Sequence, residues 1–372
     1  MTSNTFITPD VVAKQGLASL RNHLVMGNLV HKAYSPEFRK VGDTVSIRKP
    51  AEFTAIEFDG DLTGEYKAIT ETSTTIKMDK TFVVPVEVTA HEMTLDVNDF
   101  YTQVAEPAGA ALAQYIDSEL TRLYRNIPYQ VTSGGTITDV ISCRKELNDN
   151  KAPFTGKRSA VLSPTTTAMM LALDTFAEVD KVGRTQALYD ASLGRLYGFD
   201  FYETQNIQTH AVGTVDLAGA VNTTAAAGAT SVVVKSLGTG TVNEGTKVTF
   251  ADDGGVYVVT EDATITSNVA TLKIYPTLED GTSADQVVTL APALTTSSEN
   301  LFFHENAFAM VTAPLAPPMG GAKGASMNFD NLSINVTYDY DSATMKNIIQ
   351  FSVLCGFKTL YPEYACRLYD AS

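Results

Sequence analysis

Residues 96–128 read DVNDFYTQVAEPAGAALAQYIDSELTRLYRNIP, and this stretch decides how the rest of the chain is interpreted. Its apolar residues recur at intervals of three and four over about seven turns, which predicts a long amphipathic helix. Pro107 either kinks this helix or marks a second start, and Pro128 ends it. A helix of this length spans roughly 40 Å, which is long for a domain of this size. The apolar stripe consists of Phe100, Val104, Ala108, Leu112, Ile116, Leu120 and Leu123.

Two elements without an evident core of their own precede this spine helix, which we assign to residues 94–128. Residues 1–40 form an N-terminal arm, in which Pro9–Val30 shows helical spacing and is expected to pack on something other than its own core. Residues 41–93 change to a period of two and predict a long hairpin. An isolated hairpin is marginal in water, so we expect this arm to lie on a neighbouring copy. The expected strands are 43–49, 74–78 and 82–88, with a polar tip at 61–73.

Pro85 lies within the last of these strands. Proline has no backbone donor for a sheet, so this strand is predicted at a sheet edge.

After the spine helix the pattern predicts mixed α/β structure at 129–210, its return at 300–325 and C-terminal strands at 326–372. Ser163-Pro164 is a helix cap followed by proline in the first turn. The fold class is therefore α+β. Between the two host segments, residues 211–299 change abruptly to Thr, Val, Ala, Gly and Asp, with short strands about ten residues apart. This spacing predicts a small inserted β-barrel or sandwich.

The inserted segment is expected to fold around its own core and to carry acidic turns. Asp252, Asp253, Glu279 and Asp280 are candidate salt-bridge partners at these turns, although an exposed pair contributes only about 0–1 kcal/mol. The expected core residues alternate within the strands: Val232, Val234, Val248, Phe250, Tyr257, Val259, Leu272, Ile274, Val287 and Leu290.

Composition and charge exclude several classes of protein. With 372 residues, 44% hydrophobic and 19% charged, the chain is an ordinary globular protein of two or three domains, not a coiled coil or a disordered chain. Its net charge of −15 opposes sequence-independent DNA binding. The first forty residues carry five basic and two acidic residues, net +3, whereas 211–299 carries three lysines and ten acids, net −7. The N-terminal arm is therefore basic and the inserted segment is acidic.

The sequence predicts no membrane span and no signal peptide, so we expect the protein to be made and kept in a cytosol. Three widely spaced cysteines, Cys143, Cys355 and Cys366, predict reduced and mostly buried thiols.

No catalytic, metal or cofactor motif has the required residues. His91-Glu92 lacks the second histidine of a zinc-protease helix, and Gly238-Thr239-Gly240 lacks the lysine of a phosphate loop. Asp252-Asp253-Gly254-Gly255 lacks the alternating oxygen ligands of a calcium loop. We therefore expect no enzyme, no cofactor and no metal, and instead a protein whose arms contact neighbours.

Three segments carry a resemblance to a known family. Residues 24–30 (LVMGNLV), 34–38 (YSPEF) and 41–50 (VGDTVSIRKP) resemble the opening of podovirus-type major capsid proteins, relatives of the Salmonella phage coat with an inserted domain. Residues 94–100 and 107–113 resemble the spine helix of that family. Gly194, Gly198-Phe199-Asp200 and Gln205-Asn206 are similar to the segment that leads into its inserted domain.

The resemblance implies the Hong Kong 97-type capsid fold, with an N-arm, an E-loop, a peripheral domain with the spine helix and an axial domain interrupted by the insertion. It implies a major capsid protein of the virion that self-assembles as hexamers and pentamers on scaffolding protein, in the bacterial host cytoplasm. The implied partners are copies of itself, scaffolding protein, portal protein and packaged DNA on the inner face. An E-loop lysine crosslinks some relatives, but not the branch resembled here. The alternatives are a phage decoration or surface-binding β protein and an enzyme without a recognisable motif.

Eight residues are expected to contact neighbouring subunits or scaffolding protein. They belong to the basic arm, the hairpin tip and the acidic turns: Lys14, Arg21, Asp59, Gly60, Glu65, Lys67, Asp252 and Asp253.

Overall fold

The computed structural model describes residues 9–32, 44–48, 73–89, 104–173, 193–251, 253–291, 296–316, 318, 323–342, 344 and 346–370. The chain divides into two units, each assembled from three segments of the sequence. Unit 1 contains Met1–Leu20, Lys32–Leu112 and Met310–Leu360, and unit 2 contains Arg21–His31, Ala113–Ala309 and Tyr361–Ser372. Among the described residues, no helix is long and apolar enough to cross a membrane.

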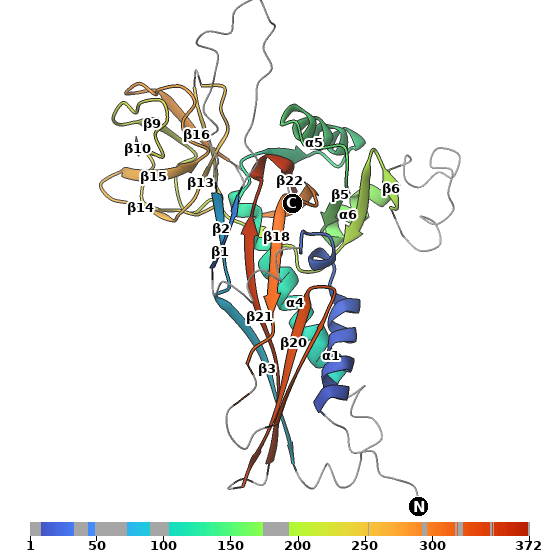
Figure 1. The fold of residues 1–372 in the computed structure, drawn as a ribbon. Coiled ribbons are helices and arrows are strands. Elements are labelled where there is room, and N and C mark those ends of the chain that lie inside the picture. The colour runs from blue at the N-terminus through green and yellow to red at the C-terminus, as the bar shows by residue number, and fades with distance from the viewer. Residues whose placement is uncertain are drawn as a thin grey trace, which may run out of the picture. The chain divides into compact units, whose positions relative to one another are not determined.

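Unit 1 is built on a sheet of long strands around β21 (Lys346–Thr359), seen side by side in Figure 1. β21 pairs with β3 (Lys80–Thr89) on one side and β20 (Leu332–Asp341) on the other. Within the described residues β3 has no second partner, and Pro85 lies opposite Gln350, which confirms the predicted edge strand. The sheet is completed by β18 (Phe308–Ala313) and β19 (Lys323–Phe329).

The predicted arm helix and the base of the predicted hairpin are both present. α1 spans Pro9–His23, so the helix ends earlier than the expected Val30, and the short 3-10 helix η1 (Met26–Asn28) follows. β1 (Thr44–Arg48) pairs antiparallel with β2 (Ser73–Lys77). The predicted tip at 61–73 lies almost entirely outside the described residues.

The spine helix is confirmed over its second half. α4 runs from Glu106 to Thr121, about 24 Å, and continues as the 3-10 helix η3 (Arg122–Asn126). Pro107 is in the first turn of α4, where its missing N–H breaks no helical hydrogen bond. Val104 and Ala105, directly before α4, are already π-helical, so Pro107 lies where the helix changes from π to α geometry. Residues 90–103, the predicted first half, lie outside the described part of the chain.

Unit 2 contains a seven-stranded sheet with two capped helices. α5 (Ile137–Asp149) begins with a reciprocal cap between Thr136 and Asp139. α6 (Pro164–Leu171) begins at the predicted cap, where the Ser163 hydroxyl accepts from Thr166 N at 3.2 Å. The strand order is β4 (Gln130–Ser133), β22 (Ala365–Asp370), β17 (Ser297–His304), β5 (Arg158–Leu162), β7 (Phe199–Glu203) and β6 (Arg195–Leu196), and β8 (Thr209–His210) also pairs with β17.

Two domain boundaries differ from the sequence prediction. The segment 326–372 was expected to be one set of peripheral strands, but its last strand, β22, pairs with β17 and β4 in unit 2. The 3-10 helix η4 (Pro362–Tyr364) turns the chain between β21 and β22. β17 starts at Ser297, so Glu299 belongs to the host sheet rather than to the insertion. An apolar β-prone run fits either sheet equally well, so periodicity alone could not assign it.

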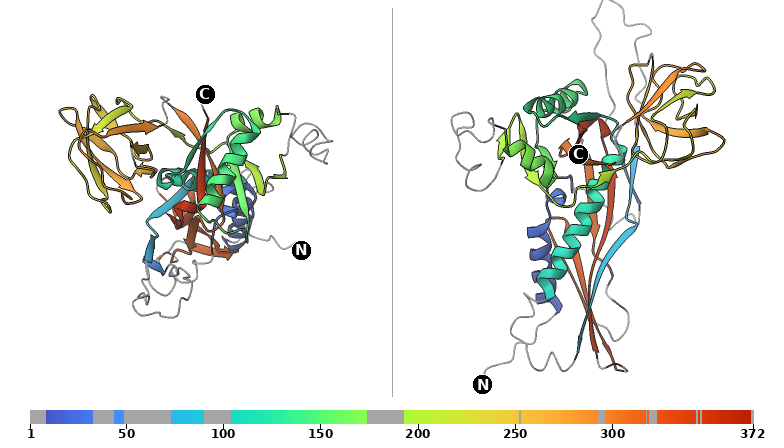
Figure 2. Two further views of the ribbon diagram at one scale, coloured as in Figure 1. Left: turned by 90° about the horizontal axis from the view of Figure 1, so that it is seen from above. Right: turned by 180° about the vertical axis from the view of Figure 1, so that it is seen from behind.

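The insertion is a closed six-stranded barrel, as the sequence predicted. Its strand order is β10 (Ser231–Lys235), β15 (Val269–Tyr275), β13 (Tyr257–Val259), β12 (Lys247–Phe250), β16 (Val287–Ala291) and β9 (Ala218–Val221), the yellow to orange strands of Figures 1 and 2. A second small sheet, β11 (Gly240–Val242) with β14 (Ala263–Ile265), was not predicted.

Nine of the ten predicted core residues of the barrel are buried, and Val287 is the exception. Its side chain is 54% exposed, whereas Val288 and Leu290 are buried. Residues 288 and 290 share one face of the strand, and 287 lies on the other. All three cysteines are buried free thiols, as expected.

The two adjacent valines give a matched test of the barrel register. Val288→Asp places an unpaired carboxylate in the core and should lower the free energy of unfolding by about 3–5 kcal/mol. Val287→Asp places the same charge on the outside and should change it by less than about 0.5 kcal/mol. Urea unfolding of the full chain, followed by circular dichroism, measures both. Equal losses in the two variants would show that this register is wrong.

Candidate functional site

The N-terminal helix α1 presents a basic outer face while its apolar face is covered by its own chain. Lys14 and Arg21 are exposed and lie seven residues apart, so they share one side of the helix. Val12 and Leu20 face away from this side and are buried; Leu17, which borders Lys14 and Arg21 on the helix surface, is buried as well. The expectation that this helix packs on something other than its own core is therefore wrong for its apolar face. The two cations on the other face are exposed.

α1 lies unusually close to α4 within unit 1. Ser19 Oγ donates to Glu106 O at 2.8 Å. A Cβ on Gly109 would lie 2.7 Å from Ser19, closer than real Cβ contacts allow. Only a small residue fits at this crossing, so the position of α1 on the spine helix is fixed. The direction of Lys14 and Arg21 is fixed with it.

Asp117 of α4 holds the turn that follows α1. The side chain is fully buried, and its two carboxylate oxygens accept from Val25 N at 2.8 Å and Gly27 N at 3.1 Å. These are backbone donors of the 3-10 helix η1 and its cap. Burial raises the pKa of Asp117 to about 6, although the backbone hydrogen bonds oppose the shift. The anchor of the arm therefore titrates close to neutral pH.

The barrel joins the host sheet through the segment Asn243–Thr246, which we call the junction loop. Asn243 Nδ2 donates to Ala211 O at 2.8 Å, which ties the loop to the start of the insertion. Glu244 Oε2 lies 3.0 Å from Arg125 Nη1 of η3. A Cβ on Gly245, whose φ is +92°, would lie 3.1 Å from Arg125 Cα. Gly245 is thus required both by its backbone conformation and by the space that Arg125 leaves.

Arg367 of β22 is the centre of this junction. It is fully buried, and its Nη1 donates to Gly245 O at 2.9 Å. The same atom lies 3.7 Å from Glu299 Oε2, which is also fully buried. Burial raises the pKa of Glu299, while Arg367 and the hydroxyl of Ser297 oppose that rise. Each charge is needed to make burial of the other tolerable.

His210 completes the junction as a neutral bridge. The Thr246 hydroxyl donates to Asn243 O at 2.8 Å, so His210 Nε2 donates to Thr246 Oγ1 at 3.3 Å. Nδ1 then accepts from the Tyr124 hydroxyl at 3.1 Å. Burial, with Arg367 and Arg125, lowers the pKa of His210 to about 3. A protonated imidazole could not accept from Tyr124, so the junction depends on the neutral form.

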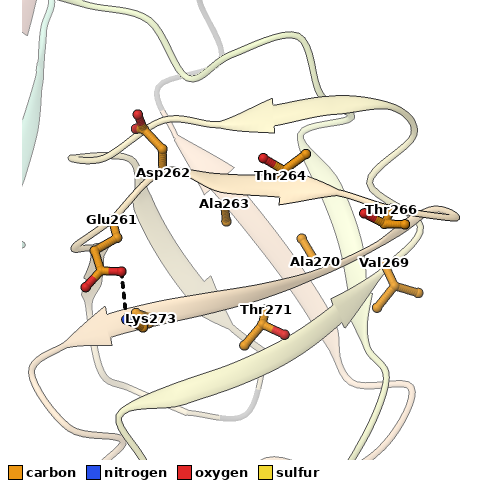
Figure 3. A pocket seen from close by; sticks show the side chains of 9 residues that line it. All are labelled: Glu261, Asp262, Ala263, Thr264, Thr266, Val269, Ala270, Thr271 and Lys273. Carbon is orange, nitrogen blue, oxygen red and sulfur yellow. Dashed lines mark hydrogen bonds and ion pairs between the residues drawn. The ribbon is translucent and has the colours of Figure 1, made fainter.

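The wall of the barrel carries a hollow of about 500 Å³ next to β14 and β15, shown in Figure 3. Ala263 and Ala270 lie in its middle and are buried, so their small side chains leave the space open. Glu261, Asp262 and Lys273 gather at one end, where Lys273 Nζ lies 2.7 Å from Glu261 Oε2. Thr264, Thr266, Val269 and Thr271 complete the lining.

The structure describes three of the eight residues predicted from the sequence as contacts. Lys14 and Arg21 are exposed on one side of α1, as an external partner requires. Asp253 is buried: its carboxylate accepts from the Tyr257 hydroxyl at 2.7 Å and from Gly255 N at 3.0 Å. The prediction of an exposed carboxylate there is wrong, because these two hydrogen bonds hold the carboxylate against its own strand. Asp59, Gly60, Glu65, Lys67 and Asp252 lie outside the described residues.

The residues that anchor the arm and the barrel were not predicted. Arg367 had one signal in the sequence: no other arginine follows Arg195, and it lies in an apolar β-prone run. A lone arginine in a buried strand indicates a paired internal charge. Asp117, His210 and Glu299 have no such signal, because the groups that each contacts lie far away in the sequence: 90 and 92 residues for Asp117, 36 and 86 for His210, and 68 from Glu299 to Arg367.

The fold and these surfaces define the class of protein as a shell-forming subunit of the tailed-phage capsid type. The described part of the spine helix, the base of the hairpin, the host sheet and the inserted barrel correspond to the expected Hong Kong 97-type elements.

Comparison with known proteins gives the family. A family model described as P22 coat protein, gene protein 5, matches residues 1–251 of this chain. The chain belongs to the P22 coat protein family. It is a structural capsid protein of a phage virion, and membership of this family favours a shell subunit over a decoration protein or an enzyme.

A solved structure shows the same fold at low sequence identity. A chain from Mycobacterium phage Che8 is 13% identical with a TM-score of 0.54, and the match covers 93% of this chain and 90% of that one. A chain titled "Capsid structure of the Cyanophage P-SCSP1u" is 15% identical with a TM-score of 0.47, over 89% and 84% of the two chains. No curated protein sequence matches this chain.

The first prediction from this geometry concerns the pH dependence of the arm anchor. The folded pKa of Asp117 is about 6, above its ordinary 3.8, so the folded protein binds an extra proton between these values. The contribution of Asp117 to stability is therefore full below about pH 3.8 and is lost as pH rises through 6. The difference amounts to about 3 kcal/mol. Asp117→Asn should remove this part of the pH dependence.

Urea unfolding of both proteins from pH 4 to pH 7 measures it. The difference between wild type and variant should fall steadily from pH 4 and level off above about pH 6. A difference that stays constant across this range would contradict the role given to Asp117.

The second prediction concerns the junction. Arg367→Met leaves Glu299 buried without its cation and should lower the free energy of unfolding by about 3–5 kcal/mol. The double variant with Glu299→Gln should be less destabilised than the single one. Arg122→Met, which removes an arginine from an exposed ion pair with Glu119, is the matched control and should cost less than about 1 kcal/mol. A loss in Arg367→Met no larger than in the control would exclude Arg367 as the anchor.

Proposed function

We propose that copies of this chain assemble as hexamers and pentamers on a scaffolding protein into an icosahedral shell that encloses phage double-stranded DNA. The observation that carries this proposal is the match of residues 1–251 to a coat protein family. Assembly takes place in the bacterial host cytoplasm, and a portal protein is a further partner. The finer features follow from the resemblance together with the surfaces described above.

The E-loop is proposed to be an intersubunit element. Within the described residues, β1 and β2 form a sheet of only two strands. A pair of strands alone is marginally stable in water, so a neighbouring copy is the natural source of further contact. Asp59, Gly60, Glu65 and Lys67, which lie between these strands in sequence, remain the proposed contacts at its tip.

The basic face of α1 is proposed to meet a negatively charged partner on the inner side of the shell, either scaffolding protein or packaged DNA. Lys14 and Arg21 project from a helix whose position on the spine is fixed by the Ser19–Gly109 crossing. A fixed pair of cations in a chain of net charge −15 favours an electrostatic contact. The barrel carries net −7 over its segment, so it is placed on the outer surface, away from DNA.

Assembly of the full chain tests the function and the basic face together. Wild-type protein, alone and with its scaffolding protein, should form shells or large particles in negative-stain electron microscopy. Lys14→Glu with Arg21→Glu should reduce the yield of regular shells severalfold, and high salt should reproduce part of the loss because it screens exposed charges.

The matched control is Arg122→Glu with Lys145→Glu, which reverses two exposed helical cations elsewhere. Compact wild-type monomers under every condition would exclude a shell protein. Wild-type shells that also form normally from the Lys14 and Arg21 variant would exclude only the role of the basic face.

A further inference from the structure

The loop Asn150–Arg158, between α5 and β5, is built as a rigid platform around a buried cation. Arg158 is only 7% exposed, and its Nη2 donates to Ala152 O at 2.8 Å. Its Nη1 donates to Asn148 Oδ1 at 2.9 Å. The guanidinium thus ties the loop to the end of α5, and burial lowers the pKa of Arg158, with Arg144 adding to the effect. This loop is ordered before any partner arrives.

The far side of the loop is fixed by the host sheet. His304 Nε2 donates to Thr155 O at 2.7 Å, while its Nδ1 accepts from Asn306 N at 3.2 Å. Gly156 has φ +98°, and a Cβ there would lie 2.6 Å from His304 Nε2. Two independent anchors, Arg158 and His304, thus hold the same nine residues.

This platform displays a large aromatic side chain to solvent. Phe154 is 77% exposed, and the centroid of its ring lies 4.8 Å from the guanidinium carbon of Arg158. An exposed phenylalanine on a mobile loop is unremarkable, but one held by two buried anchors is preorganised for contact. Preorganised aromatic residues supply much of the energy at protein interfaces, because little conformational entropy is lost when they bind.

The loop is also basic. Residues 150–158 contain Lys151, Lys157 and Arg158 and no acid, in a chain of net charge −15. The carboxylate of Glu305, from outside the loop, lies close to Gly156. An acidic surface with an apolar floor is therefore the complementary partner. Double-stranded DNA fits less well, since an aromatic side chain gains most by stacking on bases that are not already stacked.

We propose that this loop docks into the barrel hollow of a second copy of the chain, with Phe154 over Ala263 and Ala270. The hollow has small apolar residues in its middle. At one end Glu261 is paired with Lys273, and the exposed Asp262 accepts from Glu244 N at 2.7 Å. Lys157 or Lys151 then faces the carboxylate of Asp262, which has no cation of its own among the described ion pairs. Phe154 is 77% exposed and Asp262 is exposed as well, so the pair is not formed within one copy.

The contact is head-to-tail, with different surfaces used on the two copies. Contacts of this kind generate rings when the rotation between copies closes, as a capsomer requires. The inference rests on the proposed shell function, since it needs copies of the chain to be neighbours.

Thiol crosslinking of assembled full-length protein tests the contact directly. The three native cysteines are buried, so cysteines introduced at exposed positions are the accessible ones. Chains with Lys157→Cys are co-assembled with chains carrying Asp262→Cys and treated with a short bismaleimide. Crosslinked dimers are expected only in this mixture. Lys323→Cys replaces Lys157→Cys as the matched control at another exposed lysine.

Assembly measurements give an independent readout. Phe154→Ala should raise the concentration needed for assembly by about tenfold or more, as for an interface anchor, with an unchanged circular dichroism spectrum. Lys157→Glu should impair assembly, and combining it with Asp262→Lys should restore it.

The outcomes separate this inference from the proposed function. If the wild-type protein never forms particles, the proposed shell function is excluded. Wild-type particles with no crosslink between positions 157 and 262, or without rescue by the charge exchange, defeat the docking contact alone. Normal assembly of the Phe154→Ala variant would also exclude the docking contact alone. Crosslinks in the mixture together with rescue support the proposal.

Discussion

The arrangement of unit 2 depends on one buried guanidinium, that of Arg367. Its Nη1 donates to the junction loop, and its cationic centre lies 5.7 Å from the ring of Tyr124 at the end of the spine helix. The carboxylate of Glu299 lies in the neighbouring strand of the host sheet. Burying two charges is costly unless their hydrogen bonds are satisfied, and Gly245 O supplies one of the acceptors of Arg367, so detachment of the barrel would remove a hydrogen bond from a buried cation. This constraint fixes the barrel to the sheet more tightly than exposed ion pairs could.

Several elements of a shell subunit must be held firmly on the rest of the chain, and different contacts hold each of them here. Asp117 holds the arm through backbone donors, Gly109 allows a helix crossing that no larger residue permits, and Arg158 orders a loop through its own carbonyls. In each case the inner side of an element is fixed by buried polar or steric contacts. Its outer side is then free to carry charge or an aromatic residue toward a neighbour, without any need to reorganise on assembly.

The sequence predicted elements whose signal is local and missed contacts whose partners are distant. Alternation located the main barrel strands, and Ser163-Pro164 located the start of α6, because pleat and capping are set by residues close together. The prediction that Val287 is buried was wrong, because with two valines in succession the sequence does not show which of them faces the core. Asp117 and His210 could not be predicted as anchors, since Val25 and Thr246, which they contact, lie 92 and 36 residues away. β22 was misplaced because its apolar pattern fits either sheet.

When copies of such a chain recognise one another, charge and apolar packing contribute in different ways. At about 0.1 M salt, exposed charges are screened beyond about 10 Å, so the acidic barrel and the basic loops influence mainly orientation and encounter. An aromatic side chain over an alanine floor is insensitive to salt and acts only at contact. A shell built this way can let weakly bound, misoriented copies leave while it retains those in which apolar contact is complete. Each copy carries a net charge of −15, so copies repel one another at random encounters. This repulsion opposes unspecific aggregation and leaves the specific contact intact.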